Sequence, residues 1–288
     1  MSEPQHTLLG SDRGYRIFTW VKYLTFALLS INVYLFLAEE LVALEHTFVD
    51  GIEAGQIIQV FSATIDTGAW VILLLLFELE TSVLDDSRIR GWVKWALHGL
   101  RILCMAVIVY AFTGYYAELV MLYQASPLAQ FDACSQLSQN WSLILDLDEY
   151  APLDAANCAS VGSDAWRLNG FDIVASQQVL TDVRYLAWVD VINSGTWILV
   201  VLMLEVEVRL QLLGKLSQAL LGGLRYIKYV LYGTLLACAI YWGFKGDFLD
   251  FWDACLWLFA FIFIELNVFD WNRTSTREMG LSSGASAL

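Results

Sequence analysis

The sequence predicts an all-α integral membrane protein. We expect six transmembrane helices, paired as three tandem helical hairpins with pseudo-threefold symmetry, and a small extracytoplasmic cap between the third and fourth helices. The first supporting observation is composition, because 58% of the 288 residues are hydrophobic and only 16% are charged. A soluble domain could not bury so many apolar side chains, and the mean hydropathy is +0.57. The second observation is a set of helix-length apolar runs, and the third is a residue pattern that recurs in three of them.

Six apolar runs are long enough to cross a bilayer as α-helices, which requires about 20 residues each. They lie at 18–43, 57–81, 99–123, 184–208, 225–244 and 249–271. The first run is too long for the core of a signal peptide, and we interpret it as a retained span. Pro4, Pro127 and Pro152 are the three prolines of the sequence and fall outside every run, so the helices should lack proline kinks.

The basic residues predict the orientation of these spans. Thirteen of the sixteen Lys and Arg residues flank the runs on one side, which should be the cytoplasm. They are Arg13, Arg16, Lys22, Arg88, Arg90, Lys94, Arg101, Arg209, Lys215, Arg225, Lys228, Arg273 and Arg277. We therefore expect a protein of the inner or plasma membrane, with a cytoplasmic N-terminal segment, 1–17, and a disordered cytoplasmic tail, 272–288.

Segment 125–181 is predicted to form the extracytoplasmic cap, since it is too long for a simple turn. Short apolar stretches alternate with polar residues along it, a pattern that is compatible with short helices. Cys134 and Cys158 both lie in this segment, and on an oxidising face they can form a disulfide. The segment is also acidic. Either it concentrates cations in an outer vestibule, or it lacks Lys and Arg simply because translocated loops do.

The repeated pattern occupies the second, fourth and sixth runs and places a Glu eight residues after a Trp. The pairs are Trp70 with Glu78, Trp197 with Glu205, and Trp257 with Glu265. Four residues before each Trp stands an acid or its amide, namely Asp66, Asn193 or Asp253. The sequence is thus divided into three hairpin units, 18–81, 99–208 (which includes the cap) and 225–271. Three units of equal orientation predict a bundle around an axis along the membrane normal.

The Asp or Asn, the Trp and the Glu of one copy share a helix stripe about 120° wide and can face a common centre. In one interpretation the acids form a cation or proton path, with an outer level at Asp66, Asn193 and Asp253 and an inner level at the three glutamates. In the other, the inner glutamates form ion pairs with Lys and Arg residues at the starts of neighbouring helices and only hold the hairpins in register. The Trp rings lie near mid-span and either line a pore or fill the space between helices.

The sequence contains no pattern that indicates an enzyme. His6, His46 and His98 are scattered, the common hydrolase and nucleotide-binding motifs are missing, and we expect no cofactor and no metal. A formal net charge of −14 argues against nucleic acid as a partner. The predicted function is passage or sensing of a small cation or proton. The alternative is a non-transporting scaffold or assembly subunit. Expected partners are the lipid bilayer and either further copies of the chain or a subunit that docks on the cytoplasmic loops.

Overall fold

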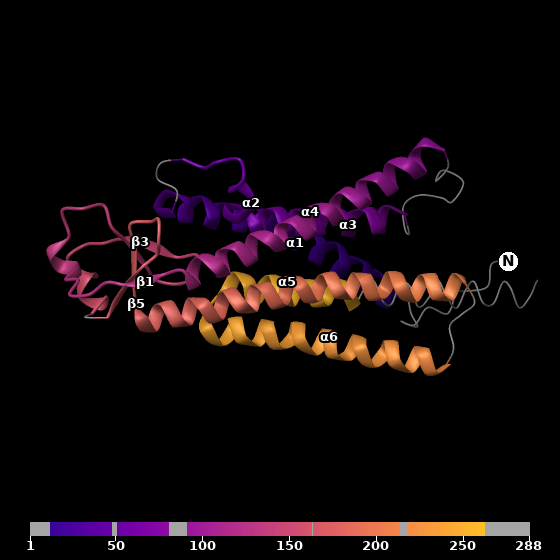
Figure 1. The fold of residues 1–288 in the computed structure, drawn as a ribbon. Helices are drawn as coiled ribbons and strands as arrows, with labels where there is room; N and C mark the ends of the chain where they lie inside the picture. Colours follow the sequence, from indigo (N-terminus) through magenta and orange to yellow (C-terminus); the bar gives the residue numbers. More distant parts are fainter. Residues whose placement is uncertain (1–11, 48–50, 81–90, 163, 214–217, 263–288) are drawn as a thin grey trace, which may run out of the picture.

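The computed structural model describes residues 12–47, 51–80, 91–162, 164–213 and 218–262. Long helices run side by side, and a small β-sheet lies at one end of them (Figure 1). We call this end of the molecule the sheet end. The helices are α1 (Asp12–Thr47), α2 (Ile57–Val60), α3 (Ser62–Glu78), α4 (Trp92–Tyr123), α5 (Gln177–Leu212), α6 (Gln218–Lys245) and a last described helix, 248–262.

Four of these helices are long and apolar enough to span a membrane. They correspond to the first, third, fourth and fifth predicted spans, and their spanning portions are Arg16–Thr47, Trp92–Tyr123, Gln177–Glu207 and Gly222–Lys245. At the positions of the second and sixth predicted spans, α3 and helix 248–262 contribute residues to the same buried core. The prediction of a mostly helical chain is therefore confirmed, and four helices meet the requirements of membrane spans, whereas the number of six spans stays a prediction.

The outward faces of the long helices are apolar, as expected for helices that meet lipid. Trp20 on α1 is 78% exposed and Ile102 on α4 is 70% exposed, although a soluble protein would bury such side chains. The inward faces form one large cluster that contains Leu29, Leu74, Ile108, Val200 and Leu235. At Gly114 of α4, the backbone of α2 approaches so closely that a side chain would collide with the carbonyl of Ile58. This contact fixes the start of α3 beside α4.

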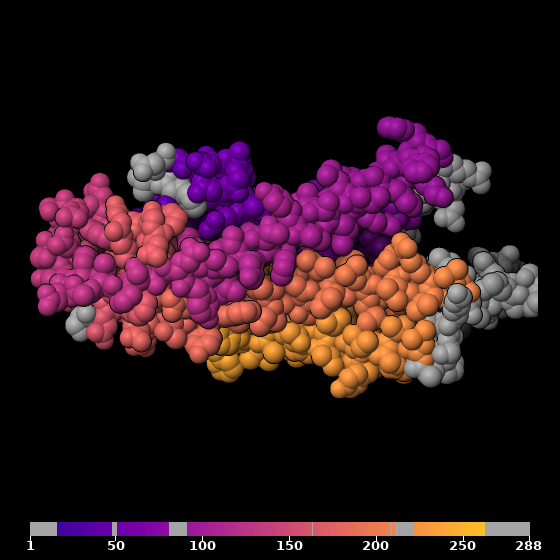
Figure 2. Space-filling view, in the orientation of Figure 1, coloured from indigo at the N-terminus to yellow at the C-terminus, as the bar shows by residue number. Residues whose placement is uncertain are grey.

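The segment between α4 and α5 forms a five-stranded sheet in the order β1-β4-β5-β2-β3. Its strands are β1 (Ser126–Pro127), β2 (Ser142–Ile144), β3 (Tyr150–Pro152), β4 (Ala165–Arg167) and β5 (Ile173–Ser176). β2 and β5 are parallel, and the other neighbours are antiparallel. Alternate residues point to opposite faces: Ile144 and Ile173 pack with the helices, whereas Leu143 and Val174 pack in a separate small core. The sheet and the helices form one elongated body (Figure 2).

The predicted disulfide between Cys134 and Cys158 is confirmed. The two cysteines lie in short 3₁₀ helices, Ala133–Ser135 and Cys158–Ser160, so the prediction of short helices in this segment also agrees with the structure. The strands were not predicted, because each has only two to four residues and such runs carry no readable alternation.

Two polar contacts fasten the sheet end to the helices. The Arg184 guanidinium on α5 donates two hydrogen bonds to the carbonyl of Leu122 in α4, at 2.9 and 3.1 Å, and lies over the rings of Tyr123 and Trp166. His46 near the end of α1 is 3.1 Å from the Ser142 hydroxyl of β2 and stacks on Tyr150 of β3. The loop between β2 and β3 is thereby held over the ends of the helices.

Several predictions fall outside the residues described. These concern most of the N-terminal segment 1–17, the tail 272–288, the end of the third hairpin unit after residue 262, and Glu265.

Candidate functional site: an acidic cavity at the sheet end

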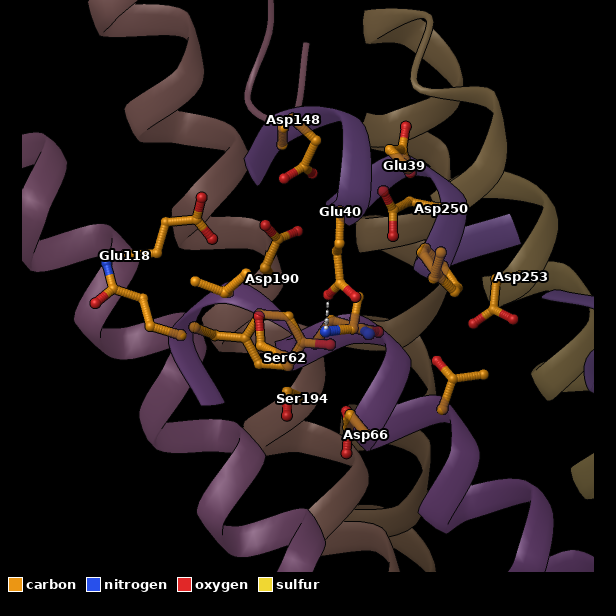
Figure 3. A pocket seen from close by; sticks show the side chains of 18 of the residues that line it. Glu39, Glu40, Ser62, Asp66, Glu118, Asp148, Asp190, Ser194, Asp250 and Asp253 are labelled. Carbon is orange, nitrogen blue, oxygen red and sulfur yellow. Dashed lines mark hydrogen bonds between the residues drawn. The ribbon is translucent and has the colours of Figure 1, made fainter. Parts of the chain in front are cut away.

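A cavity of about 100 Å³ lies between the helices near the sheet end, and carboxylates surround it (Figure 3). Seven of them come from helices and one comes from the loop between β2 and β3. They are Glu39, Glu40, Asp66, Glu118, Asp148, Asp190, Asp250 and Asp253. Within the described part of the chain, no Lys, Arg or His side chain lines the cavity. The charged side chains on its wall are therefore all of one sign.

Helix geometry arranges the acids of three helices in two levels. Asp66 of α3, Asn193 of α5 and Asp253 of helix 248–262 each precede a Trp by four residues and form the lower level, nearer the middle of the bundle. Asp190 and Asp250 come three residues earlier on their helices. At a rise of 1.5 Å per residue, they lie roughly 4.5 Å closer to the sheet end.

The two carboxylate oxygens of Glu40 have different surroundings: Oε1 is hydrogen-bonded to the backbone, and Oε2 lies on the cavity wall. Its Oε1 accepts hydrogen bonds from the backbone N–H groups of Ala63 and Thr64, at 2.8 and 3.3 Å. These N–H groups belong to the first turn of α3, where a helix has donors without intrahelical partners and where its dipole favours an anion. Glu40 therefore fixes the start of α3, and its position matches that of the upper level.

Asp253 of the lower level accepts a hydrogen bond from the Asn32 amide of α1 at 2.7 Å. Asn32 is itself buried. This bond links α1 to helix 248–262 and orients the carboxylate, which lines the cavity.

Five buried polar atoms on the cavity wall make no hydrogen bond. Three are acceptors, Glu40 Oε2, Asp66 Oδ1 and Asn193 Oδ1, and two belong to groups that can donate, Ser194 Oγ and Trp242 Nε1. A buried polar atom without a partner costs about 1–3 kcal/mol, so this cluster of them is an unusual feature of the cavity wall. Glu40, Asp66 and Ser194 are only 6%, 7% and 3% exposed, and Figure 3 shows them around one space.

The floor of the cavity consists of the three repeated tryptophans. The ring centroids of Trp70, Trp197 and Trp257 are 6.2, 6.3 and 6.4 Å apart, so the rings form a nearly equilateral triangle. All three rings line the cavity from below and belong to the large buried cluster. Beyond them the bundle is filled by apolar side chains such as Leu74, Val200 and Phe261. The rings thus fill space between helices and at the same time close the acidic cavity.

The glutamates predicted for the inner level do not reach this cavity. Glu78 is buried in an ion pair with Lys22 of α1, with an N–O distance of 2.7 Å, and also accepts a hydrogen bond from Tyr23. Glu205 is more than half exposed and pairs with Arg209 on its own helix at 2.6 Å. Glu265 lies outside the described residues. Of the predicted path, the structure brings together Asp66, Asn193 and Asp253 with the three tryptophans.

Two further ion pairs join neighbouring helices at the end opposite the sheet. Glu80 pairs with Arg101 of α4 and Glu207 pairs with Lys228 of α6, both at 2.5 Å. Together with the Lys22–Glu78 pair, they connect neighbouring helices at this end.

Sequence reasoning missed most of the upper level. Glu39, Glu40 and Glu118 come from α1 and α4, whose sequences lack the Trp–Glu pattern. The available signal was the presence of acids inside apolar runs, which by itself indicates a functional position. Asp148 could not be found in this way, because it reaches the cavity from the sheet.

Asp148 should make folding stability depend on pH. Burial raises the pKa of this carboxyl well above its ordinary value, and the negative charges of Glu39 and Asp190 raise the pKa further. Between its ordinary and its raised pKa, the folded state holds a proton that the unfolded state has lost, so stability falls as the pH increases through this window. Asp148→Asn should therefore raise the unfolding temperature at pH 8 more than at pH 5. Asp172→Asn, an exposed acid of the same segment, is the control. An equal effect of Asp148→Asn at both pH values would contradict the expectation.

No group of three or more His, Cys, Asp and Glu side chains in the described ranges is spaced to hold a metal ion. The acids therefore surround a space rather than converge on one point. Comparison with family models, curated proteins and solved structures finds no match for this chain.

Proposed function

We propose that this chain is a membrane protein that binds a small cation or proton in the acidic cavity and passes or senses it. The observation that carries the proposal is the wall of eight carboxylates without a basic side chain among the described lining residues. So many acids in one enclosed space repel each other unless protons or cations compensate their charge. Because burying unpaired carboxylates is costly, a structural role alone does not account for them.

The proposal includes a finer topology. Six spans form three hairpins around a pseudo-threefold axis, the sheet domain is an extracytoplasmic cap, and both termini face the cytoplasm of the inner or plasma membrane. The nearly equal spacing of Trp70, Trp197 and Trp257 supports the axis. Lys22, Arg101 and Lys228 form their ion pairs at the end opposite the sheet, which supports the orientation. In this arrangement the cation enters from the cap side, and passage across the bundle requires the tryptophan floor to open.

A specific observation also favours the alternative role for the inner acids. Glu78, Glu80 and Glu207 each contact a basic residue of a neighbouring helix, as expected of acids that hold a scaffold together. We therefore assign these acids to assembly of the bundle and assign cation binding to the cavity. Neither role involves an enzymatic reaction or a cofactor.

The proposal is tested by removing two charges from the lower level while preserving side-chain shape. We expect the purified wild-type protein to be stabilised by a cation or by lowered pH, by about 2.7 kcal/mol when a cation is present at 100 times its Kd. The double variant Asp66→Asn/Asp253→Asn should lose this stabilisation, together with any cation flux into proteoliposomes. The measurements are thermal unfolding and flux for protons, Na⁺, K⁺, Ca²⁺ and small amines.

Glu45→Gln is the matched control, because Glu45 lies on α1 near the cavity but is exposed and does not line it. This variant should respond to cations and pH as the wild type does. A double variant that still binds cations and transports them normally would contradict the proposal, as would a wild-type protein that responds to no cation and no proton.

A further inference from the structure

The unpaired atoms of the cavity wall define what kind of cation fits it, and this inference rests on the proposed function. Glu40 Oε2, Asp66 Oδ1 and Asn193 Oδ1 are buried acceptors that make no hydrogen bond. A bare metal ion offers no N–H or O–H group, whereas an ammonium group carries three N–H donors. Hydrogen bonds between an ammonium and a carboxylate are charge-assisted and are among the strongest in proteins. Such oxygens can therefore bind an ammonium group through hydrogen bonds or a metal ion through coordination, and the spacing of the acids decides between the two.

The spacing of the acids argues against a compact metal ion. Calcium takes six to eight oxygens at about 2.3–2.6 Å, which requires several acids to meet at one point. The described residues contain no such group. Instead, the acids are divided between two levels roughly 4.5 Å apart along the helices. Two separate positive charges, one for each level, match this arrangement better than one central charge.

Aromatic rings form the floor below the acids and part of the cavity wall. Trp70, Trp197 and Trp257 form the floor, and Tyr115 and Tyr150 also line the cavity. Aromatic faces attract an organic ammonium group and accommodate the methylene groups attached to it. A strongly hydrated inorganic ion gains little from such a surface. The cavity thus offers carboxylate oxygens and apolar ring carbons. An organic amine is complementary to both, because its ammonium group is positively charged and its methylene groups are apolar.

We propose that the cavity binds a short aliphatic diamine as its dication. One ammonium group lies at the lower level among Asp66, Asn193 and Asp253, and the other lies at the upper level near Glu40, Asp190 and Asp250. The methylene chain lies between the levels against the aromatic wall. Asp148, held by the loop between β2 and β3, contributes a further carboxylate to the wall from the sheet side. The cavity volume of about 100 Å³ suits a ligand of this size.

The test compares ligands on the wild-type protein, so that it does not depend on the folding of a variant. Titration calorimetry of the purified full chain in detergent should show putrescine binding at least about tenfold more tightly than n-butylamine, which has the same carbon chain and one ammonium group. Ca²⁺ and Na⁺ should bind more weakly than putrescine. Equal affinity for putrescine and n-butylamine would overturn the two-level arrangement.

Variants then assign the levels. Asp66→Asn and Asp190→Asn each remove one charge from a different level, and each should weaken putrescine binding about tenfold or more. Asp66→Asn should leave n-butylamine binding measurable at the upper level, and Glu45→Gln should leave both ligands unaffected. If Ca²⁺ or Na⁺ binds and neither amine does, the diamine is wrong while the proposed function stands. If no cation and no proton affects the protein, both are wrong.

Discussion

Replacing Glu78 by Gln is expected to destabilise the protein by about 3–5 kcal/mol, because it leaves the ammonium group of Lys22 buried without a counter-charge. The side chains of Lys22 and Glu78 are only 8% and 7% exposed and lie 2.7 Å apart, so water cannot replace the lost partner. Tyr23 also loses a charged acceptor for its hydroxyl group. Chemical unfolding of the purified protein in detergent measures the loss.

The double variant Lys22→Met/Glu78→Gln separates the two interpretations of Glu78. If the glutamate only holds α1 against α3, removing both charges should restore most of the stability and leave cation binding intact, since buried ion pairs are often replaceable by apolar groups. If Glu78 belongs to a cation path, the double variant should fold normally and lose flux. A stability loss below about 0.5 kcal/mol for Glu78→Gln alone would show that the buried pair is unimportant for folding.

Replacing Trp197 by Ala should cost about 3–5 kcal/mol of folding stability, as is typical when a large buried aromatic ring is removed. The ring of Trp197 is 4.5 Å from the centroid of Phe261 and takes part in the triangle with Trp70 and Trp257. Its removal opens the floor on one side. Proteoliposomes with this variant should therefore conduct small cations faster than those with the wild type.

Trp20→Ala is the appropriate control for this substitution, because Trp20 lies on α1 and is 78% exposed. It should change stability by less than about 0.5 kcal/mol in detergent and leave the flux unchanged. If the Trp197→Ala variant is as stable as the wild type and its proteoliposomes are no more permeable to cations, the triangle neither supports the bundle nor closes the cavity.

The sequence was sufficient to predict features that depend on composition and helical spacing. Hydropathy predicted the four helices that are long and apolar enough to span a membrane, and the position of two cysteines in one polar segment predicted their disulfide. The four-residue offset from each Trp placed Asp66, Asn193 and Asp253 on one side of their helices, and the structure lines one cavity with all three. Such features are local, because residues three or four apart on a helix share a face whatever surrounds them.

The remaining features depend on contacts between distant segments. Nothing in the sequence around Glu40 indicates that its carboxylate would accept hydrogen bonds from the first turn of α3, 23 residues later. The strands of the sheet are stabilised by pairing with partners such as β2 with β5, which are far apart in the chain, and not by their own composition. The sequence also did not determine which basic residue pairs with Glu78, because several were equally plausible. The packing of α1 against α3 brings Lys22 to this position.

The hydrogen bonds between Arg184 and the carbonyl of Leu122 make the sheet domain, the segment between α4 and α5, a modular insertion. They join α4 directly to α5 where the domain begins and ends, so the two helices do not rely on the intervening residues to stay together. A change in the size or sequence of the segment between α4 and α5 would therefore leave this contact between the two helices in place. Such changes would alter the part of the cavity wall that Asp148 and Tyr150 form.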